Sequence, residues 1–130
     1  KTHYNEMNVL SMHALIGAYQ PQGYEWVDEL NQVLAGNIEY FCDYVDGHFE
    51  GVSYSRPQGT YMVFLDCTEW CREHGRDIQW LLDEGARVGV GYQDGRPFHG
   101  PCHIRVNLAL PLSRVKEACD RLDRYVFNAR

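Results

Sequence analysis

A long amphipathic segment is the feature of this sequence that most constrains its fold. Apolar side chains recur at helical spacing from about Tyr24 to about Val45, and they form a single stripe: Trp26, Leu30, Val33, Leu34, Ile38, Phe41 and Val45. Acidic and amide side chains lie mostly away from that stripe, so the segment predicts a long helix with one apolar face. In a chain of 130 residues, such a helix either joins two bodies or packs along a single one.

The rest of the chain alternates between helical and strand patterns. A short helix is expected from Glu6 to Tyr19, and the stretch QPQG, with Pro21 and Gly23, separates it from the long helix. The later elements follow from periodicity and from β-branched and aromatic content. In order, they are a short strand in GVSYS, a central strand in TYMVFLDC, helices in TEWCREHG and DIQWLLDEG, strands in ARVGVG and from His103 to Leu108, and a terminal helix in LSRVKEACDRLDRYVF.

Local signals set the expected boundaries of these elements. Asp77 is the expected N-cap of its helix and Gly85 its C-terminal stop, while Ser113 is the expected cap of the terminal helix. Asp94 and Gly95 indicate a turn in the glycine-rich stretch YQDGRPFHG. The order of elements predicts an α/β (α+β) two-layer sandwich, with a small, mainly antiparallel sheet and helices packed on one side.

Composition excludes several classes of protein. Twelve basic residues against eighteen acidic ones give a net charge of −6, without the basic face that nucleic acids or anionic membranes require. No apolar run approaches the roughly 20 residues of a membrane span, and we expect no signal peptide. The five cysteines are odd in number and are not spaced like zinc ligands. We expect them to be reduced thiols of a cytoplasmic protein, with Cys67 and Cys71 buried.

Arg105 stands in the middle of HIRVNLALP, a stretch whose alternation predicts a strand. A guanidinium held on a rigid strand is a good receptor for a carboxylate. From the alternation alone it points either at solvent, which is the commoner case, or into a cleft. Alternate residues share a face, so the sequence places Ile104, Val106, Leu108 and Leu110 opposite His103, Arg105, Asn107 and Ala109.

The other chemistry-bearing residues form no catalytic or metal-binding pattern. We expect the tryptophans, Trp26, Trp70 and Trp80, to lie in the core or an interface. The histidines are scattered, without metal-ligand spacing or a nucleophile placed beside a base: His3, His13, His48, His74, His99 and His103. The residues by themselves therefore indicate one candidate anion receptor, Arg105, without a complete catalytic set.

Several ordered stretches resemble the C-terminal end of fold-type-I pyridoxal-phosphate enzymes, the class I and II aminotransferases. These stretches are RPQGTYMVFLDC, ARVGVGYQDGRPFHG and HIRVNLALP, followed by the amphipathic terminal helix. The opening, HALIGAYQPQGYEWVDELNQVLAGN, is more similar to the C–S β-lyase branch, the cystathionine β-lyase-like enzymes. The similarity runs over nearly the whole chain.

The resemblance implies a fragment of a longer, two-domain enzyme. Residues 1–22 would be a helix from the end of the large domain, and residues 23–130 would be the C-terminal small domain. Arg105 would bind the α-carboxylate of an amino-acid substrate, which favours a cleft over bulk solvent. Pyridoxal 5'-phosphate would be bound by the large domain, and the full-length enzyme would be a cytoplasmic homodimer.

The lysine that joins this cofactor to the family's enzymes has no counterpart in these residues. Lys1 is terminal and lacks the family's surroundings, and Lys116 is expected on the polar side of the terminal helix. We therefore expect the isolated chain to be inactive. The stretch from Gly95 to His103 is also shorter than the glycine-rich loop that lies near the cofactor in the C–S lyases. This difference bears on which substrate the enzyme prefers and on whether it is a lyase.

The family contains two chemistries that share the same arginine. A C–S β-lyase would eliminate a thiol from cystathionine or cysteine, and the resemblance of residues 13–37 favours it. An aminotransferase would release a keto acid instead. A different class also stays open, because a two-layer sandwich hosts many functions. In that class the chain is a stand-alone small-molecule-binding module that uses Arg105 for an acidic ligand.

Overall fold

The chain divides within its long helix. In the computed structural model, which describes residues 8–129, one unit runs to Val33 and the second begins at Leu34. The division falls inside α2 (Pro21–His48), the long helix that the apolar stripe predicted. Lys1, His3 and the expected helix start at Glu6 lie outside the described residues.

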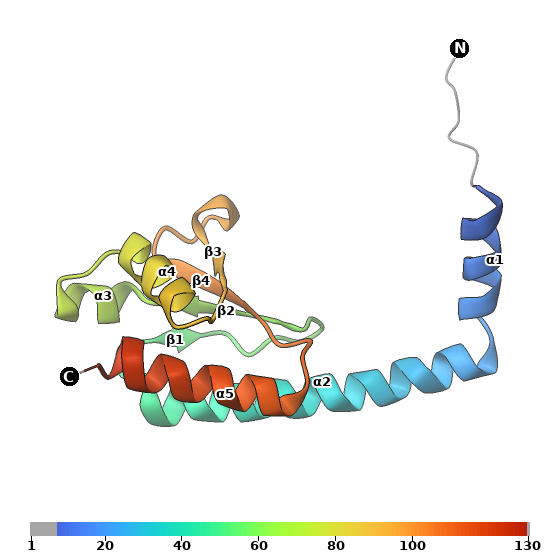
Figure 1. Cartoon of the computed structure of the whole chain (residues 1–130), viewed down its shortest axis with the longest axis horizontal. Coiled ribbons are helices and arrows are strands. Elements are labelled where there is room, and N and C mark those ends of the chain that lie inside the picture. Colours follow the sequence, from blue (N-terminus) through green and yellow to red (C-terminus); the bar gives the residue numbers. More distant parts are fainter. Residues whose placement is uncertain (1–7, 130) are drawn as a thin grey trace, which may run out of the picture. The chain divides into compact units, whose positions relative to one another are not determined.

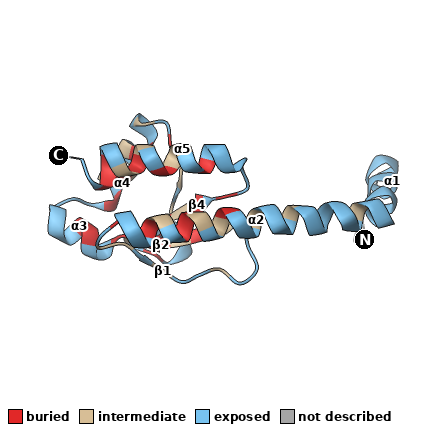
Figure 2. Cartoon of the chain, turned by 90° about the horizontal axis from the view of Figure 1, so that it is seen from below, coloured by how far each residue is buried: buried red, intermediate tan, exposed pale blue. Residues whose placement is uncertain are grey.

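The first unit contains α1 (Val9–Ala18) and the beginning of α2. Asn8 caps α1 by accepting a hydrogen bond from the Ser11 amide at 2.8 Å. Pro21 opens α2, where its missing N–H costs no helical hydrogen bond. No side chain of α1 is buried (Figure 2), and Trp26 is 62% exposed. Trp26 therefore does not lie in the core, the first of its two expected places, and the second, an interface, stays a prediction.

The second unit contains a four-stranded antiparallel sheet with the strand order β1-β2-β4-β3. The central pair is β2 and β4, with Phe64 opposite Arg105. Buried side chains alternate along both strands, so Val63 and Ile104 face the core while Arg105 lies on the opposite face, here called the outer face. The strands are β1 (Ser53–Tyr54), β2 (Met62–Asp66), β3 (Gln93–Asp94) and β4 (His103–Asn107).

Two helices cover the inner face of this sheet. The Leu34–His48 part of α2 lies beside α5 (Leu112–Leu122) under the strands (Figure 1), and buried residues gather where these helices meet the sheet (Figure 2). Phe41 from α2 and Leu122 from α5 are among the fully buried side chains. Trp70 from α3 (Thr68–His74) and Leu81 from α4 (Ile78–Arg87) belong to the same core. The predicted two-layer sandwich is confirmed.

Asn37 connects α2 to the chain that leaves β4. Its buried side-chain amide donates to the carbonyls of Leu108 at 2.9 Å and Leu110 at 2.7 Å. Both carbonyls follow Asn107, the last paired residue of the strand, so the Asn37 amide replaces a strand partner. Because the strand ends there, Leu110 is 48% exposed, and its expected place on the apolar face is wrong.

Helix α4 continues beyond Gly85, the residue at which the sequence predicted its end. Asp77 caps the start of the helix as predicted, accepting from the Trp80 amide at 2.8 Å, but the helix runs past Gly85 to Arg87. Gly85 instead makes room for Tyr92, because a Cβ at this glycine would lie 2.5 Å from the ring. The missing side chain therefore serves a close contact and not a helix stop.

Two further boundaries differ from the sequence prediction. The stretch ARVGVG forms no strand, because its first residues continue α4 and Gly89 turns the chain with a φ of +76°. The third strand lies further on, at Gln93–Asp94, inside the stretch expected to be a loop. Ser113 does not cap α5, which already begins at Leu112 and has Pro111 at its N-cap without a side-chain hydrogen bond.

Asp123 joins the end of α5 to α2. Its carboxylate accepts from the Tyr44 hydroxyl at 2.9 Å and the Asn128 amide at 2.6 Å, and it lies 3.1 Å from Nδ1 of His48. Burial by itself would raise the pKa of Asp123, but the hydrogen bonds from Asn128 and Tyr44 and the charge of His48 outweigh it. The pKa therefore lies below the usual range for an aspartate.

We expect Asp123→Asn to destabilise the fold at neutral pH and to do so less as the solution is acidified. A carboxyl whose pKa is lower in the folded chain stabilises above its unfolded pKa of about 4 and loses this contribution as pH falls through the lower folded value. Urea unfolding of both proteins between pH 6 and pH 2.5 measures the difference. A difference that is constant over this range would contradict the assignment.

Candidate functional site

Arg105 is held in place on the outer face of the sheet. Its side chain is partly buried, and Nη1 donates to Oε1 of Gln93, its register partner on β3, at 3.2 Å. The guanidinium carbon lies 4.5 Å from the centre of the Phe98 ring. Such stacking of a cation on an aromatic face is attractive. Arg105 is therefore neither free in solvent nor part of the core.

The charge of Arg105 is not neutralised within the described part of the chain. Its contacts there are an amide oxygen and an aromatic ring. Most other described arginines lie within ion-pair distance of a carboxylate, and these are Arg56, Arg72, Arg87, Arg96, Arg114 and Arg121. A partly buried guanidinium without a carboxylate partner is suited to receive the carboxylate of a ligand.

A short loop brings Phe98 over the arginine. Phe98 ends a 3₁₀ turn, Arg96–Phe98, which lies between two buried glycines, Gly95 and Gly100. Both glycines approach His103 so closely that an added Cβ would lie 2.5 Å from its carbonyl oxygen at Gly95 and 2.6 Å from its Cβ at Gly100. The absence of these two side chains therefore lets the loop lie against β4.

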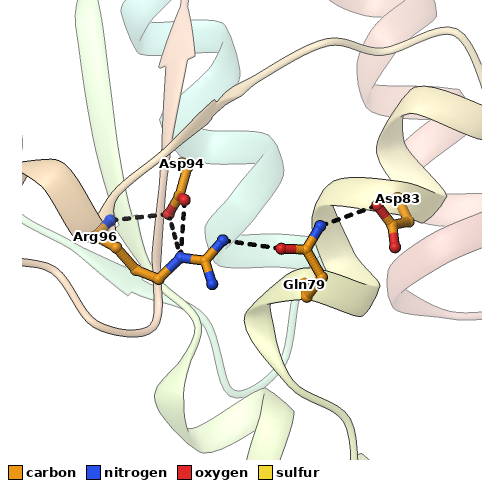
Figure 3. A network of polar contacts seen from close by, with 4 residues as sticks. All are labelled: Gln79, Asp83, Asp94 and Arg96. Atoms are coloured by element: carbon orange, nitrogen blue, oxygen red, sulfur yellow. Dashed lines mark hydrogen bonds and ion pairs between the residues drawn. The ribbon is translucent and has the colours of Figure 1, made fainter.

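A network of polar contacts fixes this loop to α4 (Figure 3). Asp94 accepts from the Arg96 amide at 2.9 Å and from Nε of Arg96 at 2.8 Å. The same guanidinium donates to Gln79 at 2.9 Å, and Gln79 donates to Asp83 at 3.0 Å. The hydrogen bond from the Arg96 amide contributes most to lowering the pKa of Asp94. Asp94 itself ends β3, and its side chain accepts from the amide two residues on, which stabilises the turn that follows it.

His103 borders Arg105 on the same strand face. Its ring lies 4.6 Å from that of Phe64, and Nε2 is 3.8 Å from Oδ2 of Asp66. Burial alone would raise the pKa of Asp66, but hydrogen bonds from Thr68 and the nearby imidazole lower it overall. Together with Phe98, the side chains of Phe64 and His103 give Arg105 aromatic neighbours on the outer face.

Lys116 lies away from this site. It is exposed on α5, the helix on the inner side of the sheet, with Nζ 5.2 Å from the centre of the Tyr40 ring. Since it is the one lysine among residues 8–129, no described lysine stands beside Arg105. The described residues therefore do not fit the covalent attachment of pyridoxal phosphate.

The described cysteines and histidines form no metal site. No group of His, Cys, Asp or Glu residues within 8–129 could hold a metal ion, and all five cysteines are free thiols. Burial raises the pKa values of Cys71 and Cys119 to about 12, so both thiols stay protonated at neutral pH. The predicted burial of Cys67 and Cys71 is confirmed.

A cavity of about 340 Å³ lies between α5 and the end of β4. Its lining is largely apolar and includes Val106 and Leu108, which belong to the core. At its rim Arg121 donates to the carbonyl of Val88 at 3.0 Å and pairs with Glu117. The charges at this cavity are already satisfied, so Arg105 is the stronger candidate for binding an anion.

Sequence reasoning missed the two side chains that order Arg105. Gln93 was expected in a loop, but it pairs with Arg105 across the edge of the sheet. Phe98 stands in a polar, turn-forming stretch, DGRPFHG, and this is the signal that could have singled it out.

Known proteins resemble the chain in sequence and in fold. It is 35% identical over 124 residues to a protein of Mycobacterium leprae named "putative cystathionine beta-lyase". The match covers 83% of this chain and 30% of the relative. The PLP-bound C–S lyase of Staphylococcus hominis has a TM-score of 0.82 at 24% identity, over 93% of this chain and 32% of the enzyme. No family model matches the sequence.

A second solved structure with a similar fold is described as an aminotransferase. A PLP-bound protein of Clostridium difficile 630, described as a putative aminotransferase, has a TM-score of 0.79 at 25% identity, over 89% of this chain and 30% of that protein. This chain matches a segment of fold-type-I pyridoxal-phosphate enzymes. The resemblance seen in the sequence is thereby confirmed, and the chain spans about 30% of the length of the curated relatives it matches.

Within residues 8–129, no helix is both long and apolar enough to cross a membrane.

We expect Asp94→Ala to loosen the loop that carries Phe98, because the substitution removes the acceptor for both the amide and the side chain of Arg96. Hydrogen exchange of the amides between Gly95 and Gly100 should become several-fold faster. Asp83→Asn, at the far end of the same network, leaves the contact between Asp94 and Arg96 intact and serves as the control. Exchange rates in Asp94→Ala equal to those of the unmodified chain would show that the contacts of Asp94 do not hold the loop.

Proposed function

We propose that this chain is the substrate-binding small domain of a longer enzyme that acts on amino acids with pyridoxal phosphate. The observation that carries the proposal is Arg105, a strand-borne guanidinium that has no carboxylate partner among the described residues. It stands in the Arg-x-Asn pattern, with Asn107 two residues on, to which the family resemblance assigns binding of the α-carboxylate. In this proposal the cofactor is held by residues outside this chain.

Arg105 would act by fixing the orientation of the substrate. Its guanidinium has five N–H donors in a planar fork, and Gln93 occupies one of them, so enough remain for two parallel hydrogen bonds to a carboxylate. Two such bonds restrict rotation of the amino acid and hold its Cα in a fixed position. The cofactor, when bound, supplies the electron-withdrawing ring that stabilises negative charge at Cα.

Elimination of a thiol, the C–S β-lyase reaction, is the chemistry we propose first. The Mycobacterium leprae relative is named for it, and so is the Staphylococcus hominis enzyme. Transamination is the second candidate, which the Clostridium difficile protein supports by its printed description. Both reactions need the same grip on the α-carboxylate, so Arg105 serves either one. The domain limits at residues 22 and 23, the homodimer and the cytoplasmic location stay predictions.

In the full-length protein, Arg105→Ala should lower kcat/KM for amino-acid substrates at least about tenfold, since a charge-assisted contact is lost from the transition state. Arg105→Lys keeps the charge without the fork and should recover only part of the activity. Arg72→Ala, an exposed arginine on α3, is the matched control and should leave the kinetics unchanged. Cofactor absorbance should be equal in all variants. Unchanged kinetics in Arg105→Ala would refute the proposed role.

Product analysis separates the two chemistries. Incubated with cystathionine, a lyase consumes water and releases a thiol, pyruvate and ammonia, and it needs no second substrate. An aminotransferase releases no ammonia and turns over only when a keto acid accepts the amino group. We expect ammonia and a free thiol in the absence of any keto acid. Turnover that depends wholly on an added keto acid would favour the aminotransferase.

A further inference from the structure

Two side chains restrain the guanidinium of Arg105 from different directions. The guanidinium carbon lies over the Phe98 ring, 4.5 Å from the ring centre. Gln93 accepts from Nη1 at 3.2 Å. Phe98 comes from the loop and Gln93 from the edge strand, so these are independent restraints on the same group.

Neither side chain is explained by the packing of the core. Phe98 is 47% exposed, so burial of apolar surface contributes little to holding it in this place. Gln93 is also exposed. Phe98 is brought to its place by a loop with two close glycine contacts and a four-residue polar network (Figure 3). This construction places one ring over one guanidinium.

An ordered arginine binds a carboxylate more tightly than a free one. The long side chain of arginine loses rotamer freedom when it is fixed by a ligand, and this loss weakens binding. Contacts that already hold the guanidinium in place before the ligand arrives reduce that loss. A ring on its face leaves the N–H groups, which lie in the plane, free for the ligand.

We propose that Phe98 and Gln93 are positioning residues that hold Arg105 ready for the substrate's carboxylate. This inference rests on the proposed function and adds to it the two residues that act through the arginine. Phe98 fixes the plane of the guanidinium, and Gln93 fixes its rotation within that plane.

The first test measures the order of Arg105 directly. Rotation about its Nε–Cζ bond is followed by NMR of the 130-residue chain carrying ¹⁵N-labelled arginine. We expect Phe98→Leu, which keeps an apolar side chain without an aromatic face, to speed this rotation about two- to fivefold, in line with a cation–π contact at an exposed site. Phe98→Tyr should restore the slow rotation. The guanidinium of Arg76, stacked at 4.8 Å on Trp80, is the internal reference and should not change.

The second test uses kinetics of the full-length protein. Phe98→Leu and Gln93→Met, which removes the acceptor at similar size, should each raise KM for an amino acid about two- to fivefold with a smaller change in kcat. In the Arg105→Ala background, the same substitutions should have no further effect, because they act only through the arginine.

The outcomes distinguish the inference from the proposed function. If rotation of Arg105 is unchanged in both Phe98→Leu and Gln93→Met, the positioning role is wrong whatever the enzyme does. The role is also wrong if these substitutions impair the Arg105→Ala protein as strongly as the wild type. If rotation speeds up but Arg105→Ala itself leaves the kinetics intact, the proposed function fails while the contact stands.

Discussion

The register between β2 and β4 is the constraint on which the rest of the structure depends. Phe64 pairs with Arg105 and Leu65 with Ile104, so one face of both strands is apolar and the other carries the guanidinium. A slip of one residue would place Arg105 in the core and Ile104 in solvent. Burial of the inner side chains against α2 and α5 therefore decides where the charge stands. The candidate site is a consequence of how the core packs.

Polar contacts at the ends of elements complement this apolar core. Asn37 satisfies the carbonyls of Leu108 and Leu110 where the strand pairing stops, and Asp123 joins α5 to Tyr44 of α2. A buried backbone carbonyl without a partner is costly, so the Asn37 amide lets β4 end inside the fold. The sheet is short, and the Asn37 amide replaces hydrogen bonds that a longer strand would have made, while Asp123 links two helices.

The outer face is organised by a loop and not by regular structure. Gly95 and Gly100 let the chain approach β4, and the network from Asp94 to Asp83 holds the loop against α4. Phe98 thereby reaches Arg105, whose charge meets no carboxylate among the described residues. Neutralising that charge within the fold would have removed the property on which the proposed function rests. The chain matches about a third of the length of PLP-bound enzymes of the same fold, and in the proposed function the cofactor is held by residues outside this chain.

The layer architecture, the long helix, the two central strands and the face on which Arg105 stands could be predicted from the order of residues alone. These features follow from side-chain periodicity, which is a local property. The prediction failed at Gly85, at Ser113 and in ARVGVG, where a glycine contact, an earlier helix start and a turn took precedence. The contacts of Gln93 and Phe98 with Arg105 could be seen only in the folded chain, since strand pairing and loop closure bring together residues that are separated along the sequence. Such distant contacts leave no periodic trace in a single sequence, because no fixed spacing along the chain produces them.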